Sequence, residues 1–599
     1  MLTAPHAFTL AQWQQAYCEG QSPAELIDAL RAELDAADNA WIALASETQL
    51  ATQFAELAAA LQAAGGDSSK LPLYGVPFAI KDNIDAAGWP TTAACPEFAY
   101  SAEADATVVA RLRAAGAILI GKTNLDQFAT GLVGTRSPYG AVSNSFDPAY
   151  VSGGSSSGSA SVVARGLVPF ALGTDTAGSG RVPAGFNNIV GLKPTKGWLP
   201  NTGLVPACRT VDCISVFALT VGDALAVATI AGGYDAADAY SRQNPHSAKV
   251  GMPAQPRLAV PSNPEFFGDN QNQAVYEAAL GKLRELGAEL VEIDFAPFRQ
   301  LAEQLYYGSW VAERTVAVEG VNPEHINPVV RGIVENGHKY SACDAYKAEY
   351  TRAELSRVIN EALVGFDALV VPTSPTIRTL AEMQAEPVLF NSQFGTYTNF
   401  TNLADLSALA VPAGFREDGL PAGITLIAPA WHDQALAAFG QRWQQALALP
   451  LGATGKPLPA QEQSSQPAPG SIRVAVVGAH LTGMPLNFQL TTRDAVLVEQ
   501  TTSAAHYRLY ALPGTVPPKP GLARVAEDGA EIIVELWDVP QARFGEFVAE
   551  IPPPLGIGNL ELADGRWVKG FICEPYALHG ARDITSFGGW RAFIASTKA

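Results

Sequence analysis

Serine hydroxyls are concentrated in the stretch VSGGSSSGSAS at Val151–Ser161, which holds six serines and three glycines. A flexible linker would separate two domains, whereas an apolar helix and a buried strand are predicted directly after this stretch. A phosphate-binding loop would have a lysine after its last glycine, and none follows. The GxSxG pattern at Gly154–Gly158 is that of a nucleophile elbow, but the preceding SFDPAYVSGG lacks the strand that such a turn needs. The chemistry of the serines therefore depends on the segments that accompany them.

Two further segments would complete a hydrolytic site: GVPFAIKDN at Gly75–Asn83 and GTDTAGSGRVPA at Gly173–Ala184. Together with the serine-rich stretch they resemble the amidase signature family, in which two serines and a lysine replace a Ser-His-Asp arrangement. The resemblance covers most of residues 70–430 and includes GKTNLDQFATG (121–131), GLKPTKG (191–197), DALVVPTSP (367–375) and NLADLSALAVPAG (402–414). Several matched segments in order are far more specific than any one of them.

Carried over residue by residue, the resemblance implies Ser179 as the nucleophile, Ser155 as the bridging serine and Lys81 as the base. It also implies a non-proline cis peptide at Gly154–Ser155. A free lysine has a pKa of about 10.4, so Lys81 can act as a base near neutral pH only if burial disfavours its ammonium form. The apolar residues of YGVPFAIKDN would supply such surroundings, and Asp82 would oppose them if it faced Lys81. A proton would then pass from Ser179 through Ser155 to Lys81 during attack on the amide carbon.

The resemblance also implies how the oxyanion is stabilised. Consecutive backbone amides would bind it, namely those of Thr176, Ala177, Gly178 and Ser179. Asp175 and Arg181 flank this loop and are expected to brace it.

The segment EQLYYGSWVAERTVAV at Glu303–Val318 is predicted to form a helix in which Tyr306 and Arg314 face broadly the same way. It resembles the stretch with which allophanate hydrolases, a group within the family, hold the carboxylate of their substrate. Arginine suits this task because its planar fork donates two parallel hydrogen bonds. The alternative is a solvent-exposed arginine paired with a glutamate.

The whole chain of 599 residues carries a formal net charge of −19, which repels nucleic acid and anionic membranes, so neither is an expected partner. An anionic substrate would need a local cation against this field. The six cysteines are scattered without a CxxC pair or metal-ligand spacing, and MLTAPHAFTL is not typical of a signal peptide. We therefore expect a cytoplasmic protein with reduced thiols, no metal and no cofactor.

The elements that must position these residues indicate an α/β fold. Short apolar runs such as LYGVPFAI, AILIGK, VPFALGTD and FDALVVPTSPT alternate with helical segments, which predicts an amidase domain over residues 71–454 with a central mixed sheet surrounded by helices. Residues 1–70 are expected to form a helical arm of this domain. In the arm, SPAELIDALRAELDA predicts a helix with a capping box of Ser22 and Glu25. One face of that helix would carry Leu26, Leu30 and Leu34.

The composition changes at residues 455–471, GKPLPAQEQSSQPAPGS, which is typical of a linker. Residues 472–599 contain the strand-like runs IRVAVVGAHL, DAVLVEQT, HYRLYALPG and EIIVELWDVP and predict a small β-rich α+β domain. An amidase core with such a tail looks like an allophanate hydrolase, whose C-terminal domain has a γ-glutamylcyclotransferase-like fold.

This resemblance implies hydrolysis of allophanate, urea-1-carboxylate, to ammonia and carbon dioxide through an acyl-enzyme. The tail would assist decarboxylation of the N-carboxycarbamate product, with His480 as the candidate residue, or it would serve assembly. Allophanate would come from biotin-dependent urea carboxylation by urea carboxylase or from s-triazine breakdown through cyanuric acid and biuret. The family also suggests a homodimer through the helical N-terminal region.

Three alternatives remain from the sequence. The first is another amidase of the family with broader specificity. The second is the A subunit of a tRNA-dependent amidotransferase, which would travel with a partner subunit but lack the tail. The third is a catalytically inactive scaffold, against which the presence of Lys81, Ser155 and Ser179 together speaks.

Overall fold

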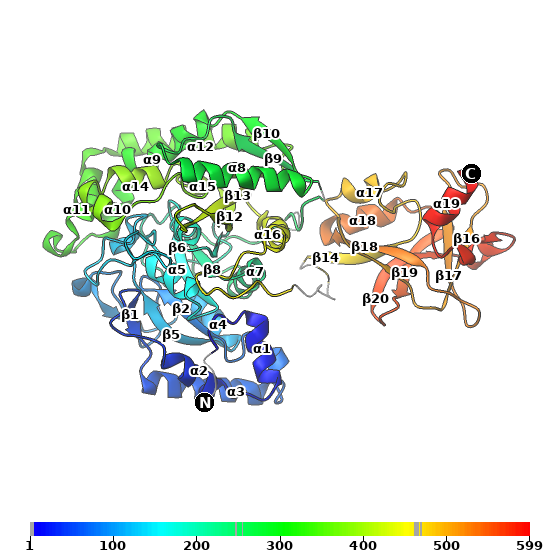
Figure 1. Ribbon diagram of the computed structural model, residues 1–599, viewed down its shortest axis with the longest axis horizontal. Coiled ribbons are helices and arrows are strands. Elements are labelled where there is room, and N and C mark those ends of the chain that lie inside the picture. Colours follow the sequence, from blue (N-terminus) through cyan, green and yellow to red (C-terminus); the bar gives the residue numbers. More distant parts are fainter. Residues whose placement is uncertain (1–4, 246–247, 254, 461–466, 468–469, 599) are drawn as a thin grey trace. The chain divides into compact units, whose positions relative to one another are not determined.

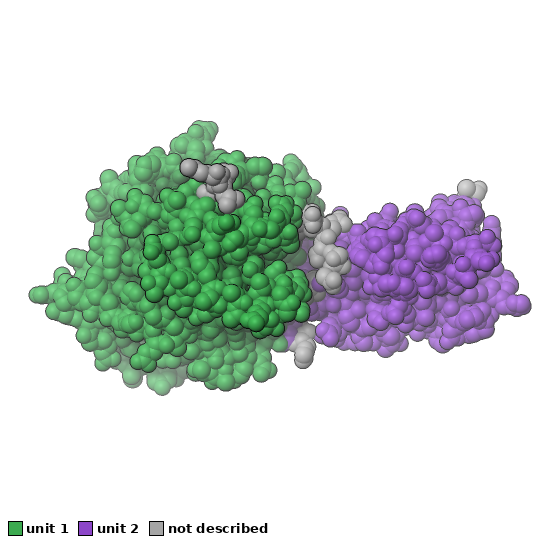
Figure 2. Space-filling model, turned by 90° about the horizontal axis from the view of Figure 1, so that it is seen from below, with its two compact units in different colours: residues 1–244, 257–460 green, residues 245–256, 461–599 purple. Residues whose placement is uncertain are grey.

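The computed structural model describes residues 5–245, 248–253, 255–460, 467 and 470–598. They form two compact units, residues 1–244 with 257–460 and residues 245–256 with 461–599, coloured separately in Figure 2. The short segment 245–256 belongs to the second unit, which no sequence pattern indicated. Residues 461–466 and 468–469 of the expected linker lie outside the described residues. Within the described part of the chain, every helix is too short or too polar to cross a membrane.

A mixed sheet of 11 strands runs through the described residues of the first unit, in the order β1-β5-β2-β6-β8-β7-β12-β13-β11-β9-β10 (Figure 1). Its strands are β1 (Trp41–Leu44), β2 (Pro77–Lys81), β5 (Ile118–Thr123), β6 (Phe170–Asp175), β7 (Val190–Lys193), β8 (Cys213–Ala218), β9 (Arg257–Pro261), β10 (Glu289–Ile293), β11 (Ala368–Pro372), β12 (Leu406–Phe415) and β13 (Pro421–Pro429). The apolar runs predicted β2, β5, β6 and β11, whose residues are all buried. The predicted α/β fold with a central mixed sheet is confirmed.

Strand β2 is parallel to both of its neighbours, β5 and β6. From β6 onward to β11 the neighbouring strands are antiparallel. A separate small ribbon pairs β3 (Pro90–Thr91) with β4 (Tyr100–Ser101). Because β2 and β6 run side by side in the same direction, the residues at their carboxyl ends lie next to each other.

Helices cover the sheet of the first unit (Figure 1). They are α1 (Leu10–Cys18), α2 (Pro23–Arg31), α3 (Glu47–Ala63), α4 (Thr107–Ala114), α5 (Ser157–Ala164), α6 (Val182–Phe186), α7 (Val221–Ala231), α8 (Asn270–Glu285), α9 (Ala296–Tyr307), α10 (Val311–Ala317), α11 (Pro328–Glu335), α12 (Ala342–Ala362), α13 (Leu380–Ala385), α14 (Leu389–Phe394), α15 (Phe400–Leu403) and α16 (Asp433–Leu447). The expected apolar helix and buried strand are α5 and β6, but α5 begins at Ser157, inside the serine-rich stretch and not after it.

The predicted N-terminal helix differs from the observed α2 in two ways. Ser22 makes no side-chain capping hydrogen bond, so the predicted capping box with Glu25 is wrong. The helix ends at Arg31, so Leu34 lies beyond it. Just past this end, the side chain of Asp35 accepts a hydrogen bond from the backbone amide of Ala37 at 2.8 Å. Such local turns compete with helix formation.

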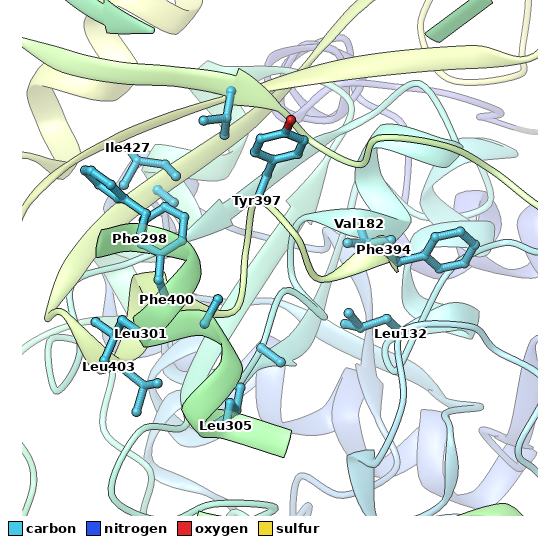
Figure 3. Close-up of a cluster of buried hydrophobic side chains, with 14 of the residues drawn as sticks. Leu132, Val182, Phe298, Leu301, Leu305, Phe394, Tyr397, Phe400, Leu403 and Ile427 are labelled. Atoms are coloured by element: carbon cyan, nitrogen blue, oxygen red, sulfur yellow. The ribbon is translucent and has the colours of Figure 1, made fainter. Parts of the chain in front are cut away.

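A buried apolar cluster joins the loops near the serine-rich stretch to α9 (Figure 3). The ring of Phe298 in α9 meets Phe400 in α15 edge to face, with centroids 5.1 Å apart. Other members come from the same two helices, from α6 and α14, from the loops and from the sheet, among them Leu132, Ala177, Val182, Leu301, Leu305, Phe394, Tyr397, Leu403 and Ile427. The cluster thus fixes α9 against the segments that carry the candidate site.

The second unit has a five-stranded sheet in the order β15-β18-β14-β20-β19 and a three-stranded sheet in the order β17-β16-β21 among its described residues. Its elements are β14 (Ser471–Val476), α17 (Phe488–Thr491), β15 (Val496–Thr502), β16 (Tyr507–Ala511), β17 (Pro520–Arg524), β18 (Ile533–Pro540), α18 (Gln541–Ala549), β19 (Leu555–Glu561), β20 (Trp567–Cys573), β21 (Arg582–Asp583) and α19 (Trp590–Lys598). The predicted small β-rich domain is confirmed, and the four quoted runs correspond to β14, β15, β16 and β18.

Candidate active site

Lys81 lies at the carboxyl end of β2 and is completely buried. Its Nζ donates hydrogen bonds to Ser155 Oγ at 2.7 Å and to Ser156 Oγ at 3.1 Å, in the residues that lead into α5. A third bond, at 2.6 Å, goes to Thr174 Oγ1 near the end of β6. The parallel pairing of β2 with β6 therefore brings the segments 75–83 and 173–184 together at the lysine. The serine-rich stretch 151–161 contacts the lysine at the same place. Ser156 and Thr174 are contacts that sequence reasoning missed, although both lie in quoted segments.

Burial is the main influence on the pKa of Lys81 and lowers it to about 7. The carboxylates of Asp126, Asp212 and Asp175 oppose this shift, in that order, and the charge of Arg314 assists it. The sequence led us to expect a charge-poor pocket, whereas three carboxylates act on Lys81. Burial outweighs them, so Lys81 can take up a proton near neutral pH.

Asp82 would oppose the lowered pKa of Lys81 if it faced that residue, but its carboxylate binds other groups. Its carboxylate accepts hydrogen bonds from the backbone amide and hydroxyl of Thr92, at 2.9 Å and 2.5 Å. It also forms a buried ion pair with Lys122 at 3.4 Å. Asp82 is not among the leading influences on the pKa of Lys81, which are burial, Asp126, Asp212, Asp175 and Arg314.

The peptide between Gly154 and Ser155 is cis, as the family resemblance led us to expect. A side chain at position 154 would place its Cβ only 2.2 Å from Oδ2 of Asp126, so glycine is required there. The backbone amide of Asp126 in turn donates to the carbonyl of Ser155 at 3.1 Å. These contacts hold Ser155 against Lys81.

Ser179 is buried, and its Oγ donates to the carbonyl of Gly131 at 3.3 Å. The described contacts include no hydrogen bond between Ser179 and Ser155. Within the described residues, the backbone amides of the preceding loop also have no acceptor, namely those of Thr176, Ala177, Gly178 and Ser179. Gly178 has φ +142°, and a Cβ there would meet Thr398 Oγ1 at 2.4 Å. A run of free amides beside a buried serine is suited to binding an oxyanion.

Asp175 and Arg181 form a buried bidentate ion pair across this loop, with distances of 2.8 Å and 2.9 Å. Asp175 also accepts from the backbone amide of Gly180 at 3.0 Å. Burial raises the pKa of Asp175, but the charge and hydrogen bonds of Arg181 outweigh it and hold the pKa below its usual range. The ion pair thus joins the two ends of the loop 175–181.

Arg314 is almost fully buried and lies over the ring of Tyr306, with its guanidinium carbon 4.9 Å from the ring centroid. Its Nη2 donates to the Tyr306 hydroxyl at 3.3 Å, and its Nη1 donates to Thr130 Oγ1 at 3.0 Å. The predicted single helix over 303–318 is wrong, because the chain leaves the helical conformation at Gly308 and α9 and α10 are separate. The two side chains still meet.

Asp212 is a further buried carboxylate that sequence reasoning missed. It accepts a 2.5 Å hydrogen bond from the hydroxyl of Thr176 and a 2.8 Å bond from the backbone amide of Ala207. Burial raises the pKa of Asp212 to about 6, against the effect of these hydrogen bonds. It lies in VDCIS, next to the matched segments, where no local pattern set it apart.

His480 follows β14 in the second unit and is 9% exposed. Its ring stacks on Phe571 with centroids 4.9 Å apart, and its Nε2 lies 2.7 Å from Gln489 Oε1. These three residues line a cavity of about 170 Å³, together with Lys519 and Glu550. Burial lowers the pKa of His480.

Taken together, the first unit holds a buried serine beside free amides, a second serine bonded to a lysine of lowered pKa, and a buried arginine nearby. This set can perform nucleophilic attack on an amide carbonyl with proton transfer to lysine.

Comparison with known proteins agrees with this chemistry. The profile of the amidase family matches residues 25–437, and that of the allophanate hydrolase C-terminal domain matches residues 472–595. The solved allophanate hydrolase of Kluyveromyces lactis superposes with a TM-score of 0.86 at 44% identity, covering 99% of this chain and 100% of that one.

Two other relatives cover different shares. The urea amidolyase of Lachancea kluyveri is 48% identical over 93% of this chain, which spans only 31% of the length of that protein. The A subunit of the glutamyl-tRNA(Gln) amidotransferase of Symbiobacterium thermophilum is 36% identical over 63% of this chain and 84% of its own length. The extent of the matches separates them: the amidotransferase protein matches only part of this chain, whereas the allophanate hydrolase matches nearly all of it. The chain belongs to the amidase signature family of amide hydrolases and carries the C-terminal domain of the allophanate hydrolases.

Proposed function

We propose that this chain hydrolyses allophanate, with Ser179 as nucleophile, Ser155 as the bridging serine and Lys81 as the base. The observation that carries the proposal is the buried guanidinium of Arg314. It lies over Tyr306 and bonds to Thr130, one residue before the carbonyl that accepts from Ser179. A buried cation at this place suits an amide substrate that bears a carboxylate.

The reaction begins with Ser179 Oγ turning from the Gly131 carbonyl toward Ser155. As Ser179 attacks the terminal amide carbon of allophanate, its proton passes to Ser155, and the Ser155 proton passes to Lys81. The oxyanion receives hydrogen bonds from the free amides of the loop, those of Thr176, Ala177, Gly178 and Ser179. Collapse of this intermediate breaks the terminal C–N bond, and the leaving nitrogen takes a proton from the same relay to leave as ammonia.

Water then attacks the acyl-enzyme, again with Lys81 accepting a proton through Ser155, and the Ser179 ester breaks. The product is N-carboxycarbamate, which carries two carboxylates on one nitrogen. Its nitrogen takes up a proton as carbon dioxide leaves to give carbamate, which takes up a second proton and breaks down to ammonia and a second carbon dioxide. The sum is two ammonia and two carbon dioxide for each allophanate.

Arg314 and Tyr306 would hold the substrate carboxylate at the end opposite to the scissile bond. The guanidinium supplies the local cation that a protein of net charge −19 needs to bind an anion. An uncharged amide of the same size gains nothing from this contact and leaves the guanidinium buried without a carboxylate in contact. We therefore expect strong preference for the carboxylated substrate.

The second unit would assist decarboxylation of N-carboxycarbamate, with His480 in its cavity as the candidate group. The cavity supports this role because a histidine, a lysine and a glutamate line a volume that suits a small anion. The lowered pKa of His480 would keep its ring neutral at physiological pH. We also propose that this unit has a γ-glutamylcyclotransferase-like fold.

In the cell we propose a cytoplasmic homodimer that receives allophanate from urea carboxylase. Similarity to urea amidolyases, of which this chain spans about a third, favours urea over biuret and cyanuric acid as the source. An amidotransferase component is the second candidate, since relatives of that name match the core alone.

Ammonia release from allophanate and from malonamate, at mildly alkaline pH, tests the proposal with wild type and Ser179→Ala. Allophanate turnover that is lost in the variant and much weaker on malonamate supports both mechanism and substrate. Equal turnover of the two would point to an amidase of broader specificity. Activity that survives in Ser179→Ala would overturn the assignment of the nucleophile.

A further inference from the structure

Arg136 is a second buried guanidinium next to Arg314. Its side chain is held by two main-chain carbonyls, with Nη1 donating to Thr130 at 2.9 Å and Nη2 donating to Pro387 at 2.7 Å. Arg314 bonds to the hydroxyl of the same threonine at 3.0 Å. Two positive charges therefore meet at Thr130, and the next residue, Gly131, contacts Ser179.

Neither of these arginines is in ion-pair contact with a carboxylate in the described part of the structure, although burial, which lowers the pKa of Arg314, is outweighed by Cys208, Tyr306, Asp212 and Glu313, which together raise it. No carboxylate forms an ion pair with either, and the Nε of each is buried without an acceptor. The carboxylate of Asp126 accepts instead from the backbone amides of Val133, Gly134 and Arg136. Burial lowers the pKa of Arg136, Asp126 and Tyr306 oppose this, and the charge of Arg314 adds to it.

The contrast with the remaining buried arginines makes this arrangement informative. Each of those in the described residues pairs with a carboxylate: Arg181 with Asp175, Arg473 with Asp538 and Arg493 with Glu550. A buried charge with no carboxylate in contact is costly, and two of like sign cost more. Hydrogen bonding to main-chain carbonyls does not by itself require a buried positive charge, because an uncharged donor such as an amide would serve equally. A bound anion would offset the cost.

We infer that Arg136 is a specificity-determining residue that acts with Arg314 to select an anionic amide, so that the carboxylate is bound by a doubly positive site. This inference rests on the carboxylate site of the proposed function. Arg136 also positions Arg314, since it fixes the main chain of the threonine to which Arg314 bonds. Its charge strengthens binding of a carboxylate and contributes nothing toward a neutral amide of the same shape.

Calorimetric titration of the Ser179→Ala protein tests this without turnover. Malonamate serves as the anionic probe and malonamide, its uncharged diamide, as the neutral probe. Arg136→Gln and Arg136→Lys are each added to the Ser179→Ala background. Arg111→Gln is the control, because Arg111, like Arg136, donates to main-chain carbonyls. Its three acceptors are those of Ala231, Gly233 and Tyr234, none of which belongs to the site.

We expect Arg136→Gln to weaken malonamate binding at least tenfold and to change malonamide binding less than twofold. Arg136→Lys should recover part of the loss because it restores the charge, and Arg111→Gln should have no effect. Malonamate affinity within twofold of the parent in Arg136→Gln, or an equal loss for both probes in a protein with an unchanged melting temperature, would overturn the inference.

Arg136→Lys retains the buried charge and keeps the test decisive if the glutamine variant does not fold. An anion preference that the lysine variant keeps in part or in full supports the inference, and one that vanishes overturns it. Failure of the proposed function is separate. It would appear as no allophanate turnover by wild type, whatever the effect of Arg136 on malonamate.

Discussion

The ammonium of Lys81 donates a 2.7 Å hydrogen bond to Ser155 Oγ, although the two residues are 74 positions apart in the sequence. The bond joins the end of a strand to a residue that leads into a buried helix. Because burial brings the pKa of Lys81 to about 7, the pair can pass a proton in either direction under physiological conditions.

The first prediction is a rise of kcat/KM with pH through about 7, because only the neutral amine of Lys81 accepts a proton. Lys81→Met should lower kcat roughly a thousandfold or more.

Lys81→Met should also raise the melting temperature of the protein, most of all at low pH. Lys81 has a pKa of about 7 in the folded protein and about 10.4 in the unfolded one, so the unfolded state binds more protons between these values. Stability therefore falls as pH falls through this window, and the full penalty remains below about pH 7. A pH–rate profile and melting curves from pH 5 to 9 check both effects; a flat profile through neutral pH would contradict the role of Lys81.

A second prediction concerns Asp212, whose negative charge raises the pKa of Lys81. In Asp212→Asn the ammonium loses this support, so the rising limb of the pH–rate profile should move to lower pH by about one unit or less. The asparagine oxygen can still accept from Thr176, which should keep kcat at the plateau within about tenfold. Asp238→Asn is the control, because Asp238 also accepts backbone hydrogen bonds, from Asn201 and Tyr240, and does not act on Lys81. A shift to higher pH would contradict the prediction.

Much of this site could be predicted because its parts lie in separate, ordered sequence segments. The matched motifs led us to Lys81 and Ser155, and the apolar runs led us to the strands β2 and β6 that bring them together. A short apolar run is a local signal for a strand, so it can be recognised without knowing which strands will pair with it.

Other features have no local signal. Asp126, Asp212 and Arg136 are ordinary charged residues in sequence, and only the fold buries them around Lys81 and Thr130. The break between α9 and α10 was missed because one glycine is tolerated in a helical pattern. The grouping of residues 245–256 with the second unit depends on long-range packing, which composition does not encode.

The third prediction is that the buried pair Asp175–Arg181 contributes strongly to the stability of the first unit. Asp175→Asn would leave Arg181 charged and partly unpaired with no access to water, which should cost about 3–5 kcal/mol. The double variant Asp175→Asn with Arg181→Met removes the unpaired charge and should recover much of this loss. Urea unfolding of the three proteins checks the order. Equal destabilisation of the single and double variants would show that lost packing, not the unpaired charge, is the cause.

In wild type, the pH dependence of this pair follows from the lowered pKa of Asp175. Its contribution to stability is fully present above the unfolded aspartate pKa of about 3.9 and is lost as pH falls through the lower folded value. The free energy of unfolding of Asp175→Asn should therefore approach that of wild type only in strong acid.

The last prediction separates the two units by their products. His480→Ala should leave the release of the first ammonia within about twofold of wild type, because Ser179 and Lys81 act in the first unit. It should slow carbon dioxide release, so that N-carboxycarbamate labelled with carbon-13 accumulates at alkaline pH and low temperature. His506→Ala is the matched control, since His506 is an exposed histidine of the same unit. Unchanged carbon dioxide release in His480→Ala would remove His480 from the reaction and leave its contacts with Phe571 and Gln489 as packing of the cavity wall.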